Sequence, residues 1–229
     1  QMLGQIKKAL GYMEQSLPLA RALGDKLNEA ATLNNIGMVY SDLGEVQNAL
    51  TYYEQALPIM REMENIDGAA IILNNIGLIY YSLDNNQNAL IYYEQALPMH
   101  RKVENSVMEA TTLHNIGMVY DNLGDKHKAI QYYHEALSIR RRMGDRGGEG
   151  NTLNSISGVY YNLGNLEKAI EYVELAIKIT YPEDPNLENY QYGLKFLKEQ
   201  LNNAPPEQPQ ESEFDALIAK LADIYCQAG

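Results

Sequence analysis

The sequence predicts an all-α fold in which antiparallel helix pairs stack side by side into an array. Three observations lead to this prediction. Similar segments recur every 40 residues, apolar residues within them follow helical spacing, and residues suited to helix ends punctuate them. The clearest recurring segments span 32–44, 72–84, 112–124 and 152–164. Tandem repetition of a helical unit is typical of a solenoid, because one helix pair cannot bury its own apolar face.

The period divides the chain into units of two helices each. In the unit 25–64, Leu33, Ile36 and Tyr40 mark one face of the first helix, and Ala49 and Tyr53 mark one face of the second. The N-terminal stretch 1–24 resembles only the second helix of a preceding unit. We therefore expect one partial and four complete units, the complete ones being 25–64, 65–104, 105–144 and 145–181.

Residues suited to helix ends recur with the same period. Before each first helix stands an N-cap residue that can accept a hydrogen bond from the helix backbone; these are Asp25, Asn65, Asn105 and Asp145. After the first helices stand residues that we expect in the left-handed conformation, namely Gly44, Asp84, Gly124 and Gly164. Basic residues suit the last turns of the second helices, and they are Arg21, Arg61, Arg101 and Arg141.

Three further residue types have predicted packing roles. Gly37, Gly77, Gly117 and Ser157 allow close helix approach, and the tyrosines at 40, 80, 120, 160 and at 52, 92, 132 are expected to pack between repeats rather than against a cofactor. Prolines at 18, 58 and 98 lie inside second helices and are expected to kink them, because each removes a backbone donor.

The pattern stops after residue 181. A capping helix is expected within 182–204, followed by a Pro-rich linker at 205–211 and an amphipathic tail helix at 212–229. The tail helix has three possible fates: docking on the capping helix or the fourth unit, docking on a second molecule, or opening a further domain. A chain that starts with half a unit also leaves open that it is a fragment of a longer protein.

Composition excludes several classes of function. The formal net charge of −12 disfavours binding to nucleic acid and to anionic membranes. The single cysteine, Cys226, forms neither an internal disulfide nor a recognised metal-binding spacing with the four histidines. We found no phosphate-binding loop and no catalytic constellation. We therefore expect a cytoplasmic protein that is not an enzyme and that uses no metal and no cofactor.

The spacing Leu33-x2-Ile36-Gly37-x2-Tyr40, followed by Ala49-x3-Tyr53-x2-Ala56, resembles the tetratricopeptide repeat. The 40-residue unit is similar to the repeats of kinesin light chains and of bacterial, especially cyanobacterial, signalling proteins. The resemblance covers about residues 3–180. It implies a right-handed superhelix whose concave groove, made by the first helices, binds a protein or peptide.

Aligning Gly37 with the glycine of the family places three rows of side chains in that groove. The amide row is Asn34, Asn74, His114 and Asn154. The apolar row is Met38, Leu78, Met118 and Gly158. The mixed row is Ser41, Tyr81, Asp121 and Tyr161. A fourth row, one turn earlier, is Ala31, Ile71, Thr111 and Asn151.

In the family, an asparagine in the amide row often bonds the backbone of a bound peptide, and a side-chain amide suits this because it both donates and accepts. The alternative is that these amides bond one another, and His114 fits a packed core equally well. The predicted first helices 28–43, 68–83, 108–123 and 148–163 contain no Lys or Arg. A clamp for a peptide carboxylate is therefore not expected, and Gly158 is expected to leave a pocket beside Met118 and Tyr161.

The favoured function is thus a protein–protein interaction module that binds a neutral or apolar peptide or helix. One alternative is a regulatory region of a longer bacterial signalling protein, for example one joined to a caspase-like protease. Another is a structural element that self-associates through its open ends or its tail helix.

Overall fold

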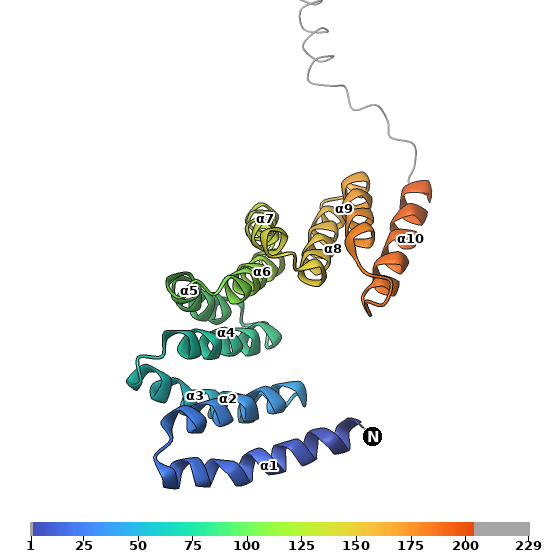
Figure 1. The fold of residues 1–229 in the computed structure, drawn as a ribbon. Helices are drawn as coiled ribbons and strands as arrows, with labels where there is room; N and C mark the ends of the chain where they lie inside the picture. The colour runs from blue at the N-terminus through green and yellow to red at the C-terminus, as the bar shows by residue number, and fades with distance from the viewer. Residues whose placement is uncertain (1, 204–229) are drawn as a thin grey trace, which may run out of the picture.

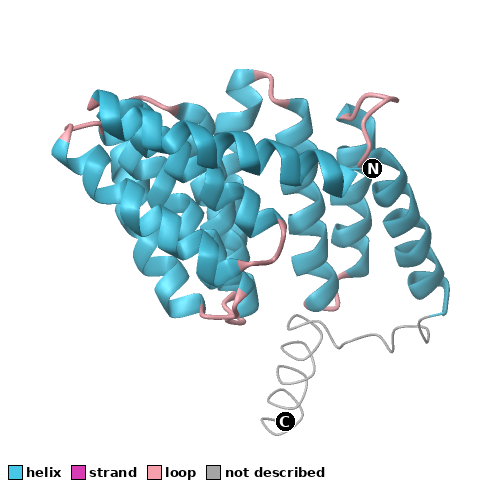
Figure 2. Ribbon diagram, turned by 90° about the horizontal axis from the view of Figure 1, so that it is seen from below, coloured by secondary structure: helices cyan, strands magenta, loops and turns pink. Residues whose placement is uncertain are grey.

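The computed structural model describes residues 2–203 of the 229-residue chain. Within that part every regular element is a helix (Figure 2). The helices are α1 Met2–Leu23, α2 Lys26–Asp42, α3 Val46–Glu62, α4 Ile66–Ser82, α5 Asn86–Lys102, α6 Ser106–Asn122, α7 Lys126–Met143, α8 Arg146–Asn162, α9 Leu166–Ile179 and α10 Leu187–Asn203. The predicted linker 205–211 and tail helix 212–229 lie outside the described residues.

The helices form a curved solenoid of antiparallel pairs (Figure 1). Each helix packs mainly on the helices before and after it in the chain. Contacts that skip one helix join α2 to α4, α4 to α6 and α6 to α8. The even-numbered helices therefore approach one another most closely, which places them on the inner side of the curve. These are the first helices of the four units, as the sequence predicts.

Local side-chain chemistry sets where the first helices begin. Asp25, Asn65, Asn105 and Asp145 are the N-cap residues of α2, α4, α6 and α8, and each accepts a hydrogen bond from the backbone N–H three residues later. This confirms the predicted caps. Each of these helices begins two residues before its predicted range, so that Lys26 and Arg146 belong to α2 and α8.

Left-handed residues end the helices. Gly44, Asp84, Gly124 and Gly164 follow the first helices with positive φ, as predicted. α1, α3, α5 and α7 end in the same way, whereas α9 ends at the extended Thr180, and the sequence departs from glycine at two of these four ends. Gly24 and Gly144 have ordinary glycine geometry, whereas Glu64 and Glu104 hold φ values of 54° and 56°. A left-handed conformation is unfavourable for a residue with a Cβ atom, so these two turns are strained.

The helix-packing glycines have one specific partner each. A Cβ atom on Gly37, Gly77 or Gly117 would lie 2.6–2.7 Å from the ring of Tyr53, Tyr93 or Tyr133 in the second helix of the same unit. The fourth unit changes both partners together. Ser157 stands for the glycine and Val173 for the tyrosine, and the Ser157 hydroxyl donates to the carbonyl of Ala169 at 2.6 Å.

The other repeated tyrosines stack in pairs. Tyr40–Tyr52, Tyr80–Tyr92, Tyr120–Tyr132 and Tyr160–Tyr172 have ring centroids 5.3–5.5 Å apart and nearly parallel planes. Each pair joins the two helices of one unit. The stacking is thus within units, and contacts to the preceding unit exist beside it: the Tyr40 hydroxyl donates to Glu14 Oε1 of α1 at 3.3 Å.

The two ends of the described array differ in how much apolar surface they leave exposed. α10 closes the C-terminal end, where Tyr190 and Leu197 are buried with residues of α8 and α9. At the N-terminal end, α1 packs on α2 and leaves Leu19 and Leu23 65% and 83% exposed. Pro18, Pro58 and Pro98 lie within α1, α3 and α5, each of which continues past its proline as a single helix.

Candidate functional site

The twelve predicted groove residues lie on the four inner helices α2, α4, α6 and α8, three on each helix. Successive inner helices contact one another, so each row runs across neighbouring helices. The rows differ in how much of each side chain is free to meet a ligand.

Neighbouring amides engage the first half of the amide row. Asn34 Oδ1 accepts a hydrogen bond from Asn75 Nδ2 at 3.1 Å. Asn74 Oδ1 accepts from Thr112 Oγ1 at 3.1 Å and from Asn115 Nδ2 at 3.4 Å, and Asn74 is only 4% exposed. These bonds join one unit to the next. Asn74 therefore contributes to the array itself, in the way that the alternative interpretation of the row describes.

His114 is held among core groups. Its Nδ1 atom lies 3.4 Å from Thr152 Oγ1, and its ring packs against Tyr133 with centroids 5.1 Å apart. Burial, together with the positive charge of Arg140, lowers the pKa of His114 to about 4. The imidazole is therefore neutral at physiological pH, and the row carries no charge.

Asn154 differs from the other members of the amide row. It is exposed, and its side chain makes no hydrogen bond with any residue in the described part of the chain. Position 155, which is asparagine in the preceding units, is serine here, and Ser155 Oγ donates to the backbone carbonyl of Asn151. The Asn154 amide thus has donors and acceptors available to a ligand.

The apolar row lies open to solvent in the first two units. Met38 and Leu78 are 45% and 42% exposed, whereas Met118 is partly buried. Gly158 ends the row, and a Cβ atom placed there would meet nothing within 4 Å. The row therefore runs from exposed apolar side chains to an empty position.

The mixed row contains one charged group. Ser41, Tyr81 and Asp121 are partly buried, and Tyr161 is 39% exposed. Asp121 pairs with Lys126, which reaches it from the start of α7. Burial is the main cause that raises the pKa of Tyr81. The predicted first-helix ranges 28–43, 68–83, 108–123 and 148–163 contain no Lys or Arg. Lys126 nevertheless brings a positive charge to the groove from α7, and the sequence did not indicate this contact.

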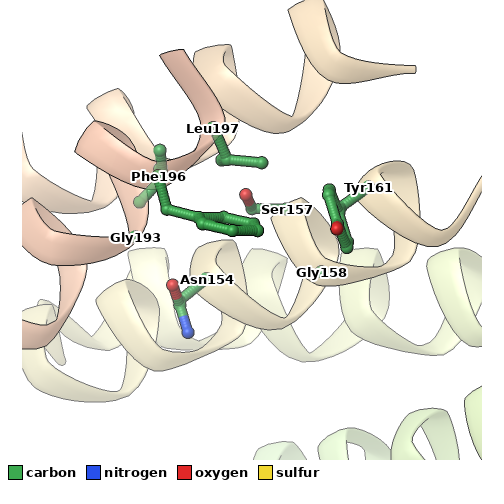
Figure 3. A pocket seen from close by; sticks show the side chains of 8 residues that line it. Asn154, Ser157, Gly158, Tyr161, Gly193, Phe196 and Leu197 are labelled. Atoms are coloured by element: carbon green, nitrogen blue, oxygen red, sulfur yellow. The ribbon is translucent and has the colours of Figure 1, made fainter. Parts of the chain in front are cut away.

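A pocket of about 190 Å³ lies between α8 and α10 (Figure 3). We call it the capping pocket. Phe196 and Leu197 extend from α10 toward Asn154, Ser157 and Tyr161 of α8. The rings of Phe196 and Tyr161 pack edge to face, with their centroids 5.7 Å apart. The remaining lining residues are Gly158, Val173 and Gly193. The glycines and Val173 leave the space, because bulkier residues there would fill it.

A second pocket, of about 290 Å³, lies on the other side of Gly158. We call it the central pocket. Tyr81 of α4, Met118 and Asp121 of α6, and Asn154 and Gly158 of α8 contribute to its lining. Asn154 and Gly158 therefore border both pockets. The hollow expected at Gly158 beside Met118 and Tyr161 is present, divided between these two pockets.

The structure thus brings six of the twelve predicted residues together around the two pockets: Tyr81, Met118, Asp121, Asn154, Gly158 and Tyr161. The other six line neither pocket: Asn34, Met38, Ser41, Asn74, Leu78 and His114. Sequence reasoning missed Phe196, Leu197 and Gly193. Their signal was the small residue at 193, one turn before Leu197, on a helix whose Leu194, Leu197 and Leu201 share one face.

The chemistry available to these pockets is that of hydrogen bonding and apolar contact. Among residues 2–203, no three histidine, cysteine, aspartate or glutamate side chains are grouped so as to hold a metal ion. In the same part of the chain, no helix combines the length and the apolar character needed to cross a membrane.

The chain matches family models of a known helical repeat. Models of the tetratricopeptide repeat match residues 1–62, 68–142 and 151–181. No curated protein matches the chain in sequence. The three solved structures described next are 16–18% identical to this chain and therefore bear on the fold.

BtubC (BKLC) from P. vanneervenii superposes with a TM-score of 0.72 at 18% identity, over 90% of this chain and 96% of the other. Aspartyl phosphate phosphatase F from Bacillus subtilis gives 0.76 at 18% identity, and 96% of this chain spans only 58% of that protein. A putative kinesin light chain from Podosopora anserina with nearly identical TPR-like repeats gives 0.62 at 16% identity, over 87% and 97% of the two chains.

Proposed function

The chain belongs to the tetratricopeptide-repeat family, and from this premise we propose that it is a protein–protein interaction module that binds a neutral, apolar peptide or helix along its inner helices. One observation carries the proposal: exposed apolar side chains on successive inner helices lead to the empty position at Gly158. A soluble domain that leaves such side chains and a hollow on one concave face has a surface suited to a partner.

The capping and central pockets supply the anchoring part of this interaction. The capping pocket is large enough for one apolar side chain, whereas the central pocket, which Tyr133, Ser155 and Asn162 also line, suits a polar one; the ridge between them carries the Asn154 amide. A peptide that inserts side chains on both sides of the ridge brings its backbone to that amide. The amide can then both donate to a backbone carbonyl and accept from a backbone N–H.

The charge of the groove supports a neutral partner. Asp121 is paired with Lys126, and His114 is neutral because its pKa is low. The stretches 28–43, 68–83, 108–123 and 148–163, which carry the groove residues, contain no Lys or Arg. Affinity therefore depends on apolar burial and neutral hydrogen bonds, which salt affects little.

The test begins with peptides selected from a random display library on the wild-type protein. We expect Gly158→Met, which installs the side chain found at Met38 and Met118, to project into the space that Gly158 leaves open, to obstruct the pockets there and to weaken these peptides by roughly tenfold or more. Asn154→Ala should cost about 1 kcal/mol for a lost neutral hydrogen bond. Gly11→Met is the matched control, because a Cβ atom at Gly11 also meets nothing within 4 Å and α1 lies outside the groove.

Fluorescence anisotropy of labelled peptides at low and high salt measures these effects. Peptides that bind the Gly158→Met and wild-type proteins equally, or whose affinity falls steeply with added salt, would contradict the proposal. Asn74→Ala is not used here, because the buried Asn74 amide joins two units and its loss changes stability as well as binding.

Self-association is a second candidate that one observation favours. α1 exposes Tyr12, Leu19 and Leu23 at 61%, 65% and 83%. These side chains lie at the N-terminal end of the described array, where a second copy could stack. Light scattering over a concentration series checks this: a constant molar mass of one chain removes the candidate, and a rising mass that Leu19→Glu abolishes supports it.

A further inference from the structure

One junction between units lacks a carboxylate that the other three junctions have. Arg21, Arg101 and Arg141 end their helices, and each Nε atom donates to a glutamate eight residues later. The distances are 2.9 Å to Glu29, 2.8 Å to Glu109 and 2.7 Å to Glu149. Arg61 occupies the same place in its unit, but residue 69 is alanine. The ion pair that recurs at three junctions of the array is absent at this one.

Arg61 also lacks the second contact of this position. Arg21 donates to Gln55, and Arg101 lies 3.6 Å from Glu135, in each case 34 residues later. The corresponding residue for Arg61 is Gln95, whose Nε2 donates to the carbonyl of Ile91 at 3.1 Å and whose Oε1 accepts from no residue in the described part of the chain. Within residues 2–203, Arg61 forms no ion pair and no side-chain hydrogen bond. Its guanidinium donors are therefore available to a ligand.

A pocket of about 300 Å³ opens where the glutamate is missing, and we call it the Arg61 pocket. It lies at the ends of α3 and α5 and the start of α4. Met60, Met99 and Ala69 form its apolar walls, and the cationic side chains of Arg61 and Lys102 also line it. In the other units, the glutamate side chains that occupy this place are only 10–19% exposed.

The charge balance of the Arg61 pocket is opposite to that of the whole chain. Its lining has two cations, Arg61 and Lys102, and one carboxylate, Glu64, whereas the chain carries −12. Lys102 forms no ion pair within the described residues either. An acidic partner is repelled by most of this molecule, so a locally positive, partly apolar hollow selects where such a partner can approach.

We propose that the Arg61 pocket receives a glutamate side chain from a protein partner. The carboxylate takes the position that Glu29, Glu109 and Glu149 hold in the other units, where it bonds the guanidinium of Arg61. The aliphatic stem lies against Met60 and Met99. The array itself is the precedent, because it buries a glutamate in this manner at three of its junctions. The site is separate from the groove, and it stands whether or not the groove binds a peptide.

Methionine-methyl NMR on the full chain tests the proposal, because Met60 and Met99 report on the pocket while Met38 and Met118 report on the groove. The probes are two blocked peptides, Ac-Leu-Glu-Leu-NH2 and Ac-Leu-Gln-Leu-NH2, together with butyrate and inorganic phosphate. We expect the Glu peptide to shift Met60 and Met99 at millimolar concentration, and the Gln peptide to bind roughly tenfold or more weakly, because it loses a charge-assisted bond.

Three variants sharpen the result. Ala69→Glu rebuilds the internal ion pair and should abolish the shifts by occupying the site. Arg61→Gln should make the Glu and Gln peptides bind equally. Arg141→Gln removes the same arginine from a junction that already has its glutamate, so it should leave the peptide titration unchanged. Circular dichroism verifies that each variant is folded.

Several outcomes would overturn the proposal. These are no shift of Met60 and Met99 with the Glu peptide, equal binding of both peptides to the wild type, or retained binding in Ala69→Glu. Competition by inorganic phosphate at the same concentration as the Glu peptide would make this a general anion site instead. Butyrate that binds as tightly as the Glu peptide would show that the peptide context adds nothing.

Discussion

The contact between Gly77 and Tyr93 allows a quantitative test of how the units are packed. A Cβ atom on Gly77 would lie 2.6 Å from Tyr93 Cε1 and 2.8 Å from its Cδ1. Ordinary contacts between carbon atoms are about 3.5–4.0 Å, so the ring must move by about 1 Å. Tyr93 is fully buried, so a move of its ring must displace the side chains packed around it. We therefore expect Gly77→Ser to destabilise the protein by roughly 1–3 kcal/mol.

The fourth unit supplies a compensating partner. Tyr93→Val alone should cost about 2–4 kcal/mol, because it leaves a cavity. Combined with Gly77→Ser, it recreates the natural pair of Ser157 and Val173, and the new hydroxyl can donate to the carbonyl of Ala89 as Ser157 does to Ala169. The double variant should therefore be more stable than the sum of the two single effects, by about 1 kcal/mol or more.

Urea denaturation followed by circular dichroism measures all three variants against the wild type. Gly158→Ser is the matched control, since no atom lies within 4 Å of its Cβ position and only the helix propensity changes, in the stabilising direction. If Gly77→Ser is as stable as the wild type, or if the two substitutions are strictly additive, the close approach of glycine and tyrosine does not determine the packing of a unit.

Two further predictions concern pH and backbone strain. An unfolded imidazole takes up a proton near its ordinary pKa of 6.5, but His114 in the folded chain does so only near about 4, so stability should fall as the pH drops from about 6.5 toward 4. The loss should reach up to ~3 kcal/mol, and His114→Asn should flatten this dependence in urea titrations at each pH. Glu104→Gly should raise the melting temperature, because it removes a left-handed conformation worth about 1 kcal/mol. The matched change Gly124→Ala should lower the melting temperature and cost a similar free energy of unfolding. Equal melting temperatures of the two variants would show that the left-handed conformation at these positions is not strained.

Features that depend on neighbouring residues in the chain could be predicted from the sequence. The N-cap of Asp25 and the left-handed turn at Gly44 each need only three or four residues of context, and both are present. Even the non-glycine turn at Asp84 follows from its place in the period. The boundaries differ by a few residues, because helix starts depend on the cap rather than on the apolar stripe.

Features that depend on how units stack could not be predicted. The amide row followed from the repeat, but whether Asn74 faces a ligand or bonds Asn115 depends on the angle between α4 and α6. Likewise, the sequence at positions 60, 100 and 140 reads methionine, histidine and arginine, and only the structure shows all three side chains to be buried. The missing carboxylate at Ala69 was visible in the sequence, but its meaning depends on the pairing of Arg101 with Glu109 in space.

The connectivity of contacts gives the array the mechanics of a spring. Helices touch chiefly their neighbours in the chain, and no described contact ties one end of the array to the other. Pitch and curvature are therefore sums of small rotations at successive junctions, each resisted only by its own interface. A slight change of angle repeated along the array alters the distance between its ends by many times the motion at one junction. We therefore expect the distance between the ends of the array to respond to small changes at its junctions more than the structure of any one unit does.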